Sequence, residues 1–150
     1  MRKILLWILV LAWMGLIFYF SSKDSVESTN QSRSIIDKTI IVDNKTDIEK
    51  EQVLISADAK LRKIAHAFVF LVLSILVCFL IKEYTLDIKK ILIFCFIICI
   101  LYAISDELHQ LCVPGRSGEV KDVLIDSIGM LCGMIIFYLS GIKIWKKVKK

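Results

Sequence analysis

The sequence contains little proline, with Pro114 the single one among 150 residues. It shows no internal repeat and no low-complexity tract, so a repeat architecture is not indicated. Metal-binding spacings such as HExxH are also absent, which argues against a metal site. The five cysteines form no scaffold pattern, because four of them lie within apolar runs, where they act as small hydrophobic residues. Apolar residues are abundant instead: 57% of the chain is hydrophobic and its mean hydropathy is +0.69, too high for an ordinary soluble domain.

The apolar residues gather in four blocks, and each block is close to the ~20 residues that a helix needs to cross a bilayer. The blocks are residues 4–20, 64–81, 91–105 and 123–142. The third block would span only about 22 Å as a helix, so we expect its helix to continue through Asp106, Glu107 and Gln110. The chain is therefore predicted to be an all-α integral membrane four-helix bundle that forms one domain over residues 1–150. The expected helices are at about 4–20, 64–81, 91–111 and 122–142.

The first block has two interpretations, because Arg2 and Lys3 precede it as they would precede a signal peptide. Its length exceeds a usual signal-peptide core, it is rich in aromatic residues, and the following residues 21–23 do not form a cleavage site. We therefore expect an uncleaved first helix. The next segment, 21–61, is expected to be an extracytoplasmic loop, in which Asp47 is a candidate helix cap.

Lysine and arginine predict the orientation. Ten of them lie at the N-terminus, between the second and third blocks, and in the C-terminal tail. The short segment 108–122 has only Arg116 and Lys121. By the positive-inside rule, both termini are then cytoplasmic, and segment 108–122 faces outward at the cell membrane. The net charge of +5 reflects this topology and contact of the tail with anionic lipids, so we expect membrane lipids as partners and no nucleic acid.

Polar residues recur at one depth on three of the expected helices. Helical spacing places Arg62 with His66, Asp106 with Gln110, and Asp122 with Asp126 on shared helix faces. Arg116 lies in a Pro-Gly turn beside them. Ionisable groups at the edge of the hydrocarbon usually mark a functional site. The predicted ligand-binding residues are Arg62, His66, Asp106, Glu107, Gln110, Arg116, Asp122 and Asp126. Below them on the fourth helix, Gly129 and Gly133 form a stripe that would let another helix approach closely.

Each of these residues also has a simpler interpretation. His66 alone is more often an interfacial residue with one hydrogen bond, and Asp122 more often a helix N-cap. Arg116 would be an ordinary loop residue. Asp126 is harder to explain in this way, because a carboxylate one turn inside a membrane helix needs a partner.

The chemistry of the set suits a phosphate or carboxylate head group, which an arginine can bind through two hydrogen bonds. His66 oriented by Asp106 or Asp122 would serve as a general base, which makes these three residues the catalytic candidates. No cofactor is indicated.

Several of these residues lie in segments that together resemble the VanZ-like family of small membrane proteins, which is associated with resistance to teicoplanin and related glycopeptides. The matching segments are 20–22, 62–68, 105–110, 114–116 and 122–129. The chain departs from the family pattern at Val69 and Phe70, where the family often has an acidic residue followed by tyrosine.

The resemblance supports an outward site for a cell-envelope lipid or glycopeptide-related ligand, with a role in antibiotic resistance. The alternative is a hydrolase or transferase that acts on a phosphorylated, lipid-linked envelope substrate. A purely structural membrane subunit would explain the helices but not the buried charges.

Overall fold

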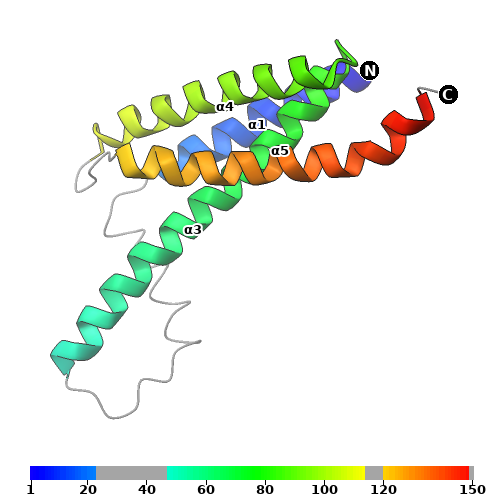
Figure 1. Ribbon diagram of the computed structural model, residues 1–150. Helices are drawn as coiled ribbons and strands as arrows, with labels where there is room; N and C mark the ends of the chain where they lie inside the picture. The colour runs from blue at the N-terminus through cyan, green and yellow to red at the C-terminus, as the bar shows by residue number, and fades with distance from the viewer. Residues whose placement is uncertain (23–46, 114–119, 149–150) are drawn as a thin grey trace.

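The computed structural model describes residues 1–22, 47–113 and 120–148, and these residues form four helices and no strand (Figure 1). The helices are α1 (Arg2–Ser21), α3 (Asp47–Lys82), α4 (Ile88–Gln110) and α5 (Val120–Val148). Each contains a stretch long and apolar enough to cross a membrane. The predicted fold class, an all-α integral membrane bundle of four helices, is confirmed.

The bounds of two helices matter for the site, and only α3 departs from its expected start. α4 continues through Asp106 and Glu107 to Gln110, as its short apolar block required. α3 begins at Asp47, so residues 47–61 are helical where the sequence suggested a loop, and its membrane stretch begins at Lys60. The remainder of the expected loop lies outside the described residues.

The first turn of α4 is fixed by a side-chain cap. The Asp87 carboxylate accepts hydrogen bonds from the backbone N–H groups of Lys89 (3.0 Å) and Lys90 (3.5 Å). Such a cap satisfies donors that have no partner within the helix.

Many apolar side chains of α1, α4 and α5 point outward. Examples are Leu101 on α4 and Ile128 and Leu139 on α5, each about 60% exposed in the isolated chain. Lipid tails cover such surfaces in a membrane protein, so helix association depends on close packing rather than on burial from water. Between the helices, Phe70, Leu73, Ile91 and Met130 are fully buried.

α3 and α5 pack closely, because two glycines of α5 leave no side chain between the two backbones. A Cβ atom on Gly129 would lie 2.0 Å from the Ala67 carbonyl oxygen, and one on Gly133 would lie 2.3 Å from the Leu71 carbonyl oxygen. The predicted glycine stripe is thus confirmed, and its partner is α3. Figure 1 shows α3 crossing the bundle obliquely, with its N-terminal half extending beyond it.

The two ends of the bundle carry different parts of the chain. The N-terminus of α1, the C-terminal part of α5 and the connection from α3 to α4 lie at one end (Figure 1). The C-terminal ends of α1 and α4 and the start of α5 lie at the other. We call the second end the polar end, because Ser21, Asp106, Glu107, Gln110 and Asp126 are buried there.

Candidate functional site

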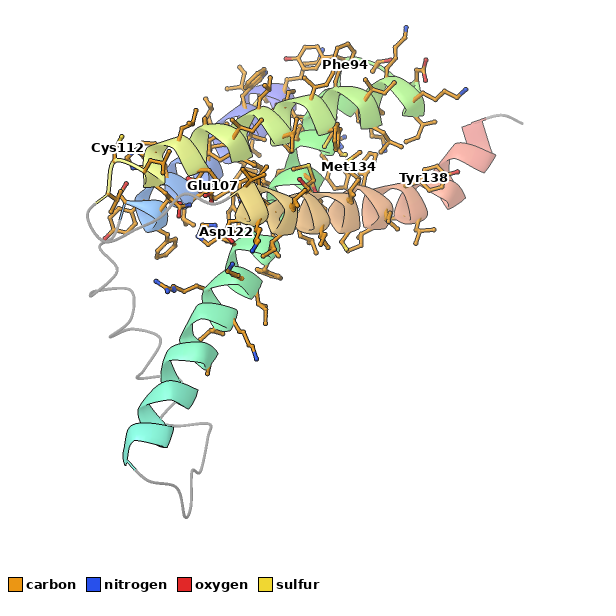
Figure 2. All side chains as sticks on the ribbon, turned by 60° about the vertical axis from the view of Figure 1, so that its left-hand side comes forward. Phe94, Glu107, Cys112, Asp122, Met134 and Tyr138 are labelled. Atoms are coloured by element: carbon orange, nitrogen blue, oxygen red, sulfur yellow. The ribbon has the colours of Figure 1, made fainter. Side chains whose placement is uncertain are left out.

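The polar end joins side chains from all four helices. Figure 2 shows Glu107 of α4, Asp122 of α5 and Cys112 at this end. The predicted residues Asp106, Glu107, Gln110 and Asp126 are buried, whereas Arg62, His66 and Asp122 are partly exposed. Arg116 lies outside the described residues.

On α4, one amide connects two carboxylates. The Gln110 Nε2 donates to Asp106 Oδ2 and to Glu107 Oε1, both at 3.1 Å. The spacing of three and four residues places these groups on neighbouring positions of one helix surface. Gln110 therefore holds both carboxylates in fixed positions within the bundle.

The end of α1 completes this group through a residue that the sequence analysis did not assign to the site. Ser21 is fully buried, and its Oγ donates to Asp106 Oδ2 at 2.8 Å. A serine near the end of a helix is typical of a helix boundary. The sequence therefore did not indicate that Ser21 has a partner on another helix. The other oxygen of Asp106, Oδ1, accepts no hydrogen bond from residues 1–22, 47–113 or 120–148.

On α5, Asp126 is the most isolated carboxylate of the site. It is fully buried, and neither of its oxygens accepts a hydrogen bond from the described part of the chain. His66 Nδ1 of α3 lies 3.9 Å from Asp126 Oδ1, beyond hydrogen-bonding distance. The sequence suggested Asp106 or Asp122 as the carboxylate for His66, whereas the structure places Asp126 opposite it.

Asp126 lies within electrostatic reach of three other carboxylates, those of Glu107, Asp106 and Asp122. Four acidic side chains from α4 and α5 therefore share one region. Like charges repel more strongly in a medium of low dielectric than in water. This region consequently favours cations and hydrogen-bond donors.

The edge of the site carries an ion pair between α3 and α5. Lys63 Nζ lies 2.8 Å from Asp122 Oδ1, and the two side chains are 41% and 27% exposed. Asp122 thus has a tertiary partner in addition to its position in the first turn of α5.

His109 belongs to a second contact between α1 and α4. Its ring stacks on Phe18 with centroids 3.9 Å apart, and its Nε2 lies 3.0 Å from Ser22 Oγ. Ser22 Oγ in turn donates to the Phe18 carbonyl oxygen. These contacts attach the end of α1 to α4 beside Asp106.

Within the described ranges, no group of three or more His, Cys, Asp or Glu side chains has an arrangement that could hold a metal ion. The site instead combines acceptor oxygens, an imidazole and basic side chains at its edge. This set can bind a polar or charged head group, and its imidazole can accept a proton.

Comparison with known proteins gives one family. The model of the VanZ/LLP1 family matches residues 6–142, which confirms the resemblance noted in the sequence. No significant match is found among curated proteins or among solved structures.

Proposed function

Since the chain belongs to the VanZ/LLP1 family, we propose that its polar end binds a cell-envelope lipid or a glycopeptide-related ligand and contributes to glycopeptide resistance. The observation that carries this proposal is the complete burial of Asp106 and Asp126 within membrane-spanning helices. Carboxylates at such positions are costly and usually serve a function. A purely structural role does not account for the buried carboxylate of Asp126, which accepts no hydrogen bond from the described residues.

The polar end faces outward in this proposal. Its support is the charge distribution, because ten lysines and arginines lie in the short segments assigned to the opposite side. In a cysteine-free background, we expect an impermeant thiol reagent added to intact cells to label Ser117→Cys. Lys89→Cys and Lys147→Cys should become labelled only after the membrane is permeabilised. The reverse pattern would contradict the outward orientation.

The functional test compares variants in a bacterial strain that is susceptible to teicoplanin. Expression of the wild-type chain should raise the inhibitory concentration, and Asp126→Asn should remove this increase. Glu83→Gln is the matched control, because Glu83 is an acidic residue paired with Arg2 at the opposite end. All variants must reach the membrane at equal levels. Equal protection by Asp126→Asn and the wild type would contradict the proposal.

An enzymatic role is the second candidate, and the position of His66 beside Asp126 favours it. A histidine oriented by a carboxylate can act as a general base on a phosphorylated, lipid-linked substrate. In that case His66→Gln should lower the rate of the catalysed reaction by roughly 10²–10⁴-fold, because glutamine forms hydrogen bonds but does not shuttle a proton. The protection of the cells should fall with it.

A pair of variants separates binding from catalysis. Arg116→Lys should impair both kinds of protein, because lysine cannot reproduce the two-pronged contact of arginine. A protein that only binds its ligand should retain much of its activity in His66→Gln. Full activity in both variants would leave only a structural role.

A further inference from the structure

The inner part of the polar end has acceptor oxygens that the described residues leave without donors. These are Asp106 Oδ1 and both carboxylate oxygens of Asp126. Both residues are fully buried. An ionised carboxylate only accepts hydrogen bonds, and burying its charge is costly unless it is paired and hydrogen-bonded.

Among the described residues, the neighbouring groups do not donate to these three oxygens. The Gln110 amide nitrogen already donates to Asp106 Oδ2 and Glu107 Oε1, and the Ser21 hydroxyl also donates to Asp106 Oδ2. The His66 ring is 3.9 Å from Asp126, too far for a hydrogen bond. With Glu107 and Asp122 also within electrostatic reach of Asp126, a cationic donor would be attracted and an anion repelled.

We propose that the ligand of this site presents a protonated primary amine, carried on a lipid, to Asp106 and Asp126. This inference rests on the proposed function, since it specifies the ligand class of the same site. A primary ammonium combines a positive charge with three N–H donors, as the side chain of lysine does. Asp106 lies one turn before the end of the membrane stretch of α4, which is the depth of lipid head groups.

Three phospholipids with the same acyl chains distinguish the features of such a ligand. Phosphatidylethanolamine has a primary ammonium, phosphatidylcholine has a cation without N–H donors, and phosphatidylglycerol has hydroxyl donors without the cation. Each would be added to the full-length protein in detergent, and bound lipid would be measured by native mass spectrometry. We expect phosphatidylethanolamine to bind about tenfold more tightly than the other two, the order of a net hydrogen bond to a charged group.

Variants assign the binding to the site. Asp126→Asn and Asp106→Asn, which preserve side-chain shape, should each reduce phosphatidylethanolamine binding to the level of phosphatidylcholine, whereas Glu83→Gln should not. Unchanged thermal unfolding of the variants in detergent shows that they are folded. Equal binding of the three lipids by the wild type, or undiminished preference in both Asp→Asn variants, would overturn the inference. Equal competition by soluble glycerophosphoethanolamine would overturn its lipid-anchored part.

The outcomes also separate this inference from the proposed function. If the three lipids bind equally but Asp126→Asn no longer protects cells against teicoplanin, the proposed amine ligand is wrong and the proposed function is retained. If Asp126→Asn loses the preference for phosphatidylethanolamine but still protects cells, the proposed amine ligand is supported and the proposed role in resistance is wrong.

Discussion

The two ends of the bundle differ in how far their charged side chains are exposed. At the end that holds the N-terminus, Arg2 Nε and Glu83 Oε1 form an ion pair at 3.0 Å in which the Arg2 side chain is 70% exposed. Trp7 donates to the Tyr84 hydroxyl on the same surface. At the polar end, Asp106 and Asp126 are fully buried. The ion pair at the first end lies where solvent and lipid head groups can stabilise it, whereas Asp106 and Asp126 at the second end depend on the protein or on a ligand.

The largest effect should come from separating α3 from α5 beneath the polar end. Gly129→Ala places a Cβ atom against the Ala67 backbone, which cannot move aside as a side chain can. We expect a loss of about 1–3 kcal/mol or more in the free energy of unfolding, measured in mixed micelles with increasing dodecyl sulfate. The functional effect should be lost as well, because His66 and Asp126 lie on these two helices.

Gly15→Ala is the control for this change. Nothing lies within 4 Å of a Cβ atom at Gly15, so the substitution should be neutral or stabilise α1 by up to ~1 kcal/mol through helix propensity. Equal destabilisation by the two substitutions would contradict the close contact of α3 with α5.

The next effect contrasts Gln110 with Arg2. Gln110→Ala removes the donor shared by two buried carboxylates, which should cost about 1–3 kcal/mol in unfolding free energy. Arg2→Ala removes an exposed ion pair and should cost at most ~1 kcal/mol. Similar losses in the same unfolding assay would show that the two ends do not differ energetically.

The smallest effect uses two adjacent serines. Ser21→Ala removes a buried hydrogen bond to Asp106 and should lower the unfolding free energy by about 1 kcal/mol. Ser22→Ala changes an exposed hydroxyl and should stay within about 0.5 kcal/mol of the wild type. A larger loss in Ser22→Ala would assign the attachment of α1 to the His109 contact instead.

These residues also show which parts of the fold and of the site could be predicted from the sequence. The length of the third apolar block predicted that α4 includes Asp106, and helical spacing predicted that Gly129 and Gly133 form a contact surface. The pairing of Asp126 with His66 depends on the relative height of two helices, which spacing within each helix does not define. Ser21 was not assigned to the site for the same reason.

The early start of α3 had only a weak signal. Asp47 was recognisable as a candidate cap, but the polar residues after it resemble those of a loop, and no apolar block supports the helix there. A helix that is continuous with a membrane span can extend into such a segment. The unfavourable first turn has already formed within the span, so each further residue adds to an existing helix.

The positions of the residues that neighbour the carboxylates have a consequence for biosynthesis. Lys63 and His66 on α3 are made before α5, which carries Asp122 and Asp126. Ser21 on α1 likewise precedes Asp106 on α4, whose other donor, Gln110, is in the same helix. Inserting an aspartate alone at the middle of a membrane helix costs roughly 2.5–3.5 kcal/mol. Since α4 and α5 leave the ribosome after the helices that carry Ser21 and Lys63, Asp106 and Asp122 can meet these partners as they enter the bilayer, and the order of synthesis favours insertion.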